Sequence, residues 1–307
     1  MVKLVAFDLD NTLYDWVSYF VPAFGAMVDV LVREHGADET ELLAGLQRVH
    51  LAQGTTEYAF ALAELDILHG IEKSAAESRE GSHPAIDAFK QEAAQRLQAY
   101  EEVPEVLATL RREGRVLVAY TDAMATYADS RLEQLGLAGY FDELVATEDH
   151  VIPDAESDFL SWLPSDRFRH RAVPYHRSLG RDERKPCPAP FKRLLGEHRV
   201  APHEAAFVGD SLTRDIPLAQ AAGVHDLHAA YGRSYDAALW ERLVAVTHWT
   251  PEDVAREKEL AANRARPTSV INSFGELPAA LARLDHAPNA PPSSSPGSRM
   301  AILRAHG

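Results

Sequence analysis

Acidic and polar side chains end a short apolar run near the N-terminus. The stretch VAFDLDNTLYD occupies residues 5–15, and Asp8 and Asp10 stand two residues apart in it. In an extended chain, residues i and i+2 point to the same face, so the two carboxylates can flank one reacting group. One can attack as a nucleophile while the other acts as an acid and then as a base.

Three further polar sites can join this pair. Thr121 and Asp122 follow the run VLVAY, Lys185 precedes a helical pattern, and Asp210 follows AAFV with Asp215 five residues later. Carboxylates can hold Mg²⁺, and a lysine ammonium and a threonine hydroxyl can bind phosphate oxygens. Crowded carboxylates should raise the pKa of one of them, although a metal opposes this for its own ligands. The set suits phosphoryl transfer.

Short apolar runs that alternate with helical patterns predict a parallel sheet with helices on both faces. Ligands in such sheets bind at the carboxyl ends of the strands. Asp8, Thr121 and Asp210 each lie at or just beyond one of these ends. The predicted strands are residues 4–7, 116–120, 143–146, 205–208, 225–230 and 269–273.

Two inserts interrupt this pattern. Residues 15–99 have apolar positions at helical spacing and no convincing strand run, so we expect an all-helical insert. A second insert covers about 149–184, and its cationic side chains either grip an anionic substrate or face solvent. The tail at 286–307 is rich in Pro, Ser and Ala and is expected to be disordered. The cationic side chains are His170, His176, Arg167, Arg169, Arg171 and Arg177.

Composition limits the classes of function. The formal net charge of −15 argues against a broad nucleic-acid-binding surface. The single cysteine, Cys187, excludes an intramolecular disulfide and does not imply an oxidising compartment. We expect no signal peptide and no membrane span, and therefore a cytoplasmic location. The sequence makes no prediction of the oligomeric state.

Taken together, the motifs resemble the haloacid dehalogenase (HAD) superfamily, in particular its phosphatase branch. DLDNT at 8–12 is similar to the DxDxT motif of that family. Thr121, Lys185 and GDSLTRD at 209–215 are similar to its second, third and fourth motifs. The resemblance implies an α/β, Rossmann-like parallel sheet core at 1–14 and 100–285. It also implies a helical cap of the first type at 15–99 that closes over the substrate.

The resemblance also implies roles for the matched residues. Asp8 would be the nucleophile and a metal ligand, and Asp10 the acid/base, with its backbone carbonyl on the metal. Thr121 would bind phosphate, and Lys185 would stabilise the nucleophile and the phosphate. Asp122 is expected either to bind substrate or to cap the following helix.

The metal that the resemblance implies is Mg²⁺. Asp210 would be one of its ligands, and Asp215 would support the site or bind through water. Tyr14, directly before the insert, and Trp16, within it, are expected to line the cap pocket because they lie close to the nucleophile. Tyr58 and Phe60 are expected in the core.

The expected function is Mg²⁺-dependent hydrolysis of a small phosphorylated metabolite through an aspartyl-phosphate. A phosphomutase, which returns the phosphoryl group to its substrate, is an alternative that the sequence separates poorly. A 2-haloacid dehalogenase is disfavoured because that branch lacks the second aspartate, here Asp10. A non-catalytic binding module would have no use for Asp10. The substrate depends on cap and insert geometry rather than on these motifs.

Overall fold

A computed structural model describes residues 1–65, 68, 83–150, 171–263 and 267–286 of the chain. The tail predicted to be disordered at 286–307 lies outside the described residues except for His286, which is the last residue of a helix. The cationic residues Arg167, Arg169 and His170 also lie outside them.

Within that part of the chain, seven parallel strands form one sheet in the order β4-β3-β2-β1-β5-β6-β7. Every neighbouring pair is parallel, and all six predicted runs are strands, which confirms the predicted α/β class. The strands are β1 Leu4–Phe7, β2 Val116–Met124, β3 Glu143–Thr147, β4 Tyr175–Leu179, β5 Ala205–Gly209, β6 His225–Ala229 and β7 Ser269–Ile271.

Helices cover both faces of the sheet. Side chains alternate between faces along a strand, so Leu4 and Ala6 of β1 pack in one cluster while Val5 and Phe7 pack in another. The first cluster includes residues of α8 (Ala189–Glu197) and α9 (Asp215–Ala222). The second includes residues of α5 (Val103–Arg112), α6 (Ala125–Gln134) and α12 (Leu277–His286).

Strand β4 was not predicted from the sequence. Its segment, YHRSL, lies in the second insert, and Tyr175 is 72% exposed. β4 is an edge strand with one neighbour, and edge strands tolerate charged and exposed residues that hide the apolar pattern. Arg177 pairs with Glu143 and Glu197, and His176 lies 3.0 Å from Asp129. These two side chains of the insert therefore bind the protein's own carboxylates.

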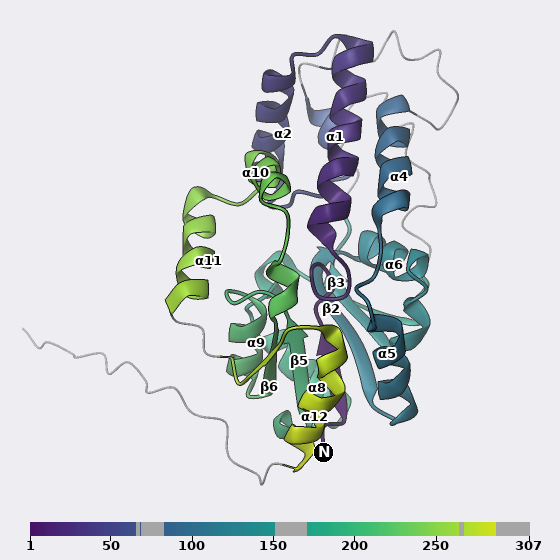
Figure 1. The fold of residues 1–307 in the computed structure, drawn as a ribbon, viewed down its shortest axis with the longest axis vertical. Coiled ribbons are helices and arrows are strands. Elements are labelled where there is room, and N and C mark those ends of the chain that lie inside the picture. Colours follow the sequence, from purple (N-terminus) through teal and green to yellow (C-terminus); the bar gives the residue numbers. More distant parts are fainter. Residues whose placement is uncertain (66–67, 69–82, 151–170, 264–266, 287–307) are drawn as a thin grey trace, which may run out of the picture.

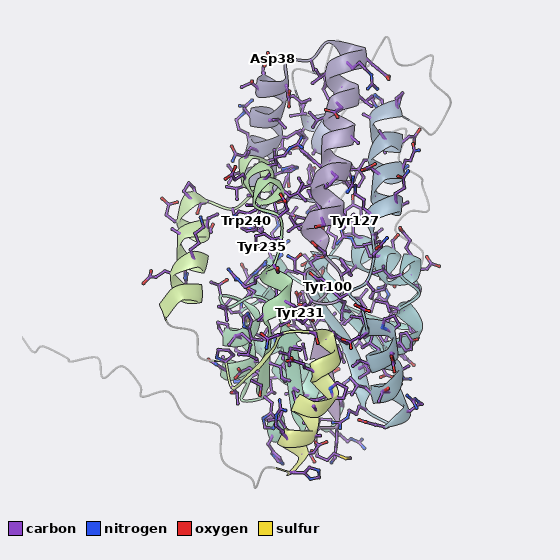
Figure 2. All side chains as sticks on the ribbon, in the orientation of Figure 1. Asp38, Tyr100, Tyr127, Tyr231, Tyr235 and Trp240 are labelled. Carbon is purple, nitrogen blue, oxygen red and sulfur yellow. The ribbon has the colours of Figure 1, made fainter. Side chains whose placement is uncertain are left out.

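The insert between β1 and β2 forms a helical cap beyond the carboxyl ends of the strands, as Figure 1 shows. The first helix begins where the Asp15 carboxylate accepts the Ser18 N–H at 2.9 Å. The second begins in the same way at Asp38, which Figure 2 labels at the far end of the cap. The described elements of the cap are α1 Trp16–His35, α2 Glu39–Gln53, the 3₁₀ helix η1 Ala61–Glu64 and α4 Pro84–Arg96.

One described helix is long and apolar enough to cross a membrane by length and composition alone. It is the stretch Trp16–Glu34 of α1, and most of it is buried inside the protein. The side chains of Val17, Phe20 and Leu31 belong to the large core cluster that the cap shares with one face of the sheet. A core helix therefore accounts for its composition.

The segment between β6 and β7 reaches back to the cap. Its helix α10 (Ala237–Val246) packs against α1 and α2 (Figure 1). His50 Nδ1 lies 2.6 Å from the carbonyl oxygen of Val246, and the hydroxyl of Thr56 lies 2.9 Å from that of Thr247. Helix α11 (Pro251–Asn263) follows, begun by Thr250, whose hydroxyl accepts the Asp253 N–H at 3.1 Å.

This interface should make stability depend on pH. Burial, with smaller contributions from Arg214 and His50, lowers the pKa of His248 from 6.5 to about 4. The unfolded chain then binds a proton in the window from about pH 6.5 to 4 that the folded chain does not, so stability falls as the pH falls. We expect His248→Gln to reduce the loss between neutral pH and about pH 5 by about 2 kcal/mol.

Urea unfolding of the wild type and the variant at the two pH values measures this difference. Gln retains a hydrogen-bonding group for Thr56, whose hydroxyl lies 2.8 Å from His248 Nδ1, but does not titrate. Equal acid losses in the two proteins would show that His248 is not protonated on unfolding.

Candidate active site

A buried lysine joins two carboxylates at the carboxyl edge of the sheet. Lys185 Nζ lies 2.5 Å from Asp8 Oδ1 and 2.7 Å from Asp215 Oδ1. The backbone N–H of Lys185 donates to the Asp122 carboxylate at 3.0 Å, which anchors the loop before α8. Burial alone would lower the pKa of Lys185, but Asp215 and Asp8 raise it above its usual value. The ammonium is therefore charged and directed at Asp8.

Gly209 allows Asp215 to reach this position. A Cβ on Gly209 would stand 2.4 Å from the carboxyl carbon of Asp215, closer than side-chain atoms approach one another. The Asp215 carboxylate also accepts the Ser211 N–H at 2.9 Å, which ties the first turn of α9 to the end of β5. Asp215 is fully buried.

Gly232 also allows two segments to approach closely at the site. It lies in the 3₁₀ helix η6 (Ala230–Arg233) after β6, and a Cβ there would stand 1.8 Å from the carbonyl oxygen of Asn11. The neighbouring Tyr231 hydroxyl donates to the carbonyl oxygen of Thr12 at 2.7 Å. The loop that carries Asp10 is thus held against the end of β6.

Three carboxylates can offer oxygens to one cation. Among the described residues, Asp8, Asp210 and Asp215 each place an oxygen within 4.8 Å of the others. Burial raises the pKa of Asp8 to about 7, with Asp215 and Asp10 acting in the same direction and Lys185 against it. Burial, Asp215 and Asp8 also raise the pKa of Asp210. Such an oxygen-rich, negatively charged set fits a hard divalent cation such as Mg²⁺.

Thr121 and Asp122 differ from their expected places in detail. β2 runs on to Met124, so both residues lie within the strand, beside an irregularity in its pairing with β3. Thr121 is buried, and its hydroxyl accepts the Ala123 N–H at 3.0 Å. The interpretation of Asp122 as a helix cap is wrong, since α6 has Met124 at its N-cap and no side-chain cap. Asp122 instead holds the Lys185 backbone.

The Asp10 carboxylate does not belong to the group of three possible ligands. Its Oδ1 accepts the Tyr14 hydroxyl at 2.7 Å and Arg131 Nη1 at 3.0 Å. Arg131 also pairs with Glu57 of the cap, and Glu57 accepts the Trp16 indole N–H at 3.2 Å. Tyr14 and Arg131 of the core thus fix the acid/base candidate, and Arg131 links it to the cap.

Sequence reasoning missed Arg131 and Glu57. Arg131 belongs to the helix ATYADSRLEQ, in which Ala128 and Leu132 are buried. An arginine on the apolar side of a helix is a signal of a buried partner, but the sequence does not name that partner. The guanidinium carbon Cζ of Arg131 also lies 5.3 Å from the ring centre of Tyr19.

A cavity of about 550 Å³ lies between the cap and α6. Tyr58 and Phe60, expected in the core, belong to its described lining although both are also buried. Tyr14 and Trp16, expected there, do not belong to it. They bind Asp10 and Glu57 instead. Tyr127 of α6, which Figure 2 labels, also lines the cavity.

The parallel sheet, the inserted helical cap and the buried carboxylate–lysine cluster define a capped α/β enzyme with an acidic site. The chain belongs to the haloacid dehalogenase-like hydrolases, because the model of that family matches residues 2–223. It is therefore an enzyme of the hydrolase class, as the motifs predicted.

Similar proteins support this assignment. A phosphoglycolate phosphatase from Vibrio vulnificus is 27% identical over 244 residues, which cover 76% of this chain and 86% of the relative. A phosphoglycolate phosphatase from Pectobacterium atrosepticum is 25% identical over 239 residues, with 78% and 84% covered. The crystal structure of a HAD phosphatase from Thermococcus onnurineus matches with a TM-score of 0.55 at 19% identity, covering 91% of this chain and 98% of that one. At that identity, the structural match concerns the fold.

Proposed function

We propose that the protein is an Mg²⁺-dependent phosphomonoester hydrolase that works through an aspartyl-phosphate on Asp8. The observation that carries the proposal is the contact of Asp8 with Lys185 inside a cluster of carboxylates. A carboxylate that must attack an anionic phosphate needs positive charge beside it. Lys185 supplies one such charge, and Asp8, Asp210 and Asp215 would hold the cation that supplies more.

The first step transfers the phosphoryl group. An oxygen of Asp8 forms a bond to phosphorus while the bond from phosphorus to the leaving oxygen breaks. Asp10 donates a proton to that oxygen, so the product leaves as a neutral alcohol. The buried Thr121 hydroxyl and Lys185 would bind the phosphate oxygens during this step.

The second step releases phosphate. Asp10, now deprotonated, takes a proton from water, and the water oxygen attacks the phosphorus of the aspartyl-phosphate. The bond from phosphorus to Asp8 breaks, which regenerates the carboxylate and frees inorganic phosphate. Because Tyr14 and Arg131 fix the Asp10 carboxylate, the same group can serve in both steps without a rearrangement.

The proposed substrate is a small phosphorylated metabolite, as the names of the phosphoglycolate phosphatase relatives suggest. A cytoplasmic location agrees with such a substrate. In this proposal, residues 1–14 and 100–285 form the core and residues 15–99 the cap that covers the substrate.

Phosphate release from a broad panel of phosphomonoesters tests the proposal. We expect release with Mg²⁺ and a loss of at least about 100-fold after treatment with EDTA, since the site then lacks part of the charge that offsets the phosphate. Addition of Mg²⁺ in excess of EDTA should restore the rate. A protein that releases no phosphate from any member of the panel with Mg²⁺ present would overturn the proposal.

A further inference from the structure

We propose that the cavity between the cap and α6 holds the leaving group of the substrate, and that this group is a large, apolar and uncharged alcohol. The inference rests on the proposed phosphomonoester hydrolysis and adds the class of substrate. It separates this protein from the phosphoglycolate phosphatases it resembles, because glycolate is small and carries a carboxylate.

Size and lining are the first argument. A volume of about 550 Å³ lies within the range of small-molecule sites, and a two-carbon leaving group would leave most of it empty. Aromatic side chains from two cap helices form much of the wall. The rings of Phe20 and Phe24 are 5.8 Å apart, and those of Phe20 and Phe89 are 5.9 Å apart. Such a wall favours an apolar body, and especially an aromatic ring.

Position is the second argument. Arg131 lines the cavity and also donates to Asp10 at 3.0 Å. The oxygen that Asp10 protonates must lie within hydrogen-bonding reach of its carboxylate. Only the guanidinium of Arg131 then separates the carbon attached to that oxygen from the cavity, so the rest of the leaving group can extend into the cavity.

Charge is the third argument. Arg131 is buried, and the carboxylates of Asp10 and Glu57 already bind its guanidinium. When Asp10 acts as the acid, Glu57 neutralises the guanidinium, so a carboxylate on the substrate would have to compete with Glu57 for this buried cation. Lys90 also lines the cavity, but it is exposed, where an ion pair contributes little. The described lining therefore selects against an anionic leaving group.

Three substrates separate these properties: ethyl phosphate, 2-(1-naphthyl)ethyl phosphate and 2-phosphoglycolate. The first two release alcohols of similar basicity, so the ratio of their kcat/KM values reports the cavity rather than the chemistry. We expect the naphthyl compound to exceed ethyl phosphate by at least about ten-fold and phosphoglycolate to be the poorest, since buried apolar area favours the larger group. Equal values for the first two, or a preference for phosphoglycolate, overturns the inference while leaving phosphate release intact.

Two alanines of α4 provide a matched pair of variants. Ala93 lines the cavity, whereas its neighbour Ala94 is exposed. Ala93→Trp should fill the cavity and lower the naphthyl-to-ethyl ratio by at least about ten-fold. Ala94→Trp places the same side chain on the same helix and should leave the ratio unchanged. An unchanged ratio in Ala93→Trp overturns the assignment of the cavity.

Glu57→Gln tests the argument from charge. Glutamine can still accept the Trp16 N–H, but Arg131 loses one of its two carboxylates. We expect the ratio of phosphoglycolate to ethyl phosphate turnover to rise about ten-fold. A ratio that stays constant shows that Glu57 does not select against carboxylates. If no member of the broader panel releases phosphate, the proposed function itself has failed.

Discussion

Asp8→Asn is expected to reduce phosphate release by at least about four orders of magnitude while the protein stays folded. An amide cannot form the aspartyl-phosphate, so the displacement loses its nucleophile. The effect on the free energy of unfolding should be within about 1 kcal/mol, because the variant removes one of several crowded carboxylates and leaves Lys185 paired with Asp215. Initial rates of phosphate release and urea unfolding curves measure the two quantities.

Asp29→Asn is a matched control, since Asp29 is an exposed aspartate of α1 far from the proposed chemistry. It should change neither rate nor stability. If Asp8→Asn kept more than about one tenth of the wild-type rate, another residue would have to be the nucleophile.

Lys185→Met is expected to lower the free energy of unfolding by about 3–5 kcal/mol and also to remove most of the activity. Methionine fills a similar volume but leaves Asp8 and Asp215 buried without their shared cation. Removing one partner of a buried ion pair costs more than the pair contributed, because the remaining charge stays desolvated. Chemical unfolding near neutral pH and initial rates of phosphate release provide the measurements.

A double variant separates charge from packing. Adding Asp215→Asn to Lys185→Met removes one of the stranded carboxylates, so part of the lost stability should return. Lys192→Met replaces an exposed lysine of α8 and should be nearly neutral. The electrostatic explanation would be refuted if the double variant were less stable than Lys185→Met.

The sequence was sufficient to predict the strands that are buried on both faces of the sheet. β1 and β5 are central strands, so every residue of LVAF and AAFV is apolar and buried, and both were predicted. The carboxylates that follow them come together because parallel strands end at the same edge of a sheet. The contact of Lys185 with Asp8 crosses 177 positions of the chain, so no local pattern predicts it, and these residues were linked only by the chemistry of phosphoryl transfer and the resemblance to a family.

The missed features depend on contacts between distant segments. Glu57 looks like a surface residue in the sequence, and its role arises because the cap carries it to Arg131, 74 positions away. Strand β4 is polar because it forms the edge of the sheet. Helix α10 follows the core strand β6 and yet packs on the cap. In each case a contact with a distant segment of the chain, rather than the local sequence pattern, determines the structure.

The packing of α10 on the cap has a consequence for product release. Enzymes with a mobile lid must open it once in each catalytic cycle, and that motion often limits the rate. Here a cap that swings away from the sheet must either break the hydrogen bonds of His50 and Thr56 to residues 246–248 or carry α10 with it. In the second case the rigid body that moves is the cap plus α10. Its hinges then lie on both sides of α10 as well as at the two chain connections between cap and sheet.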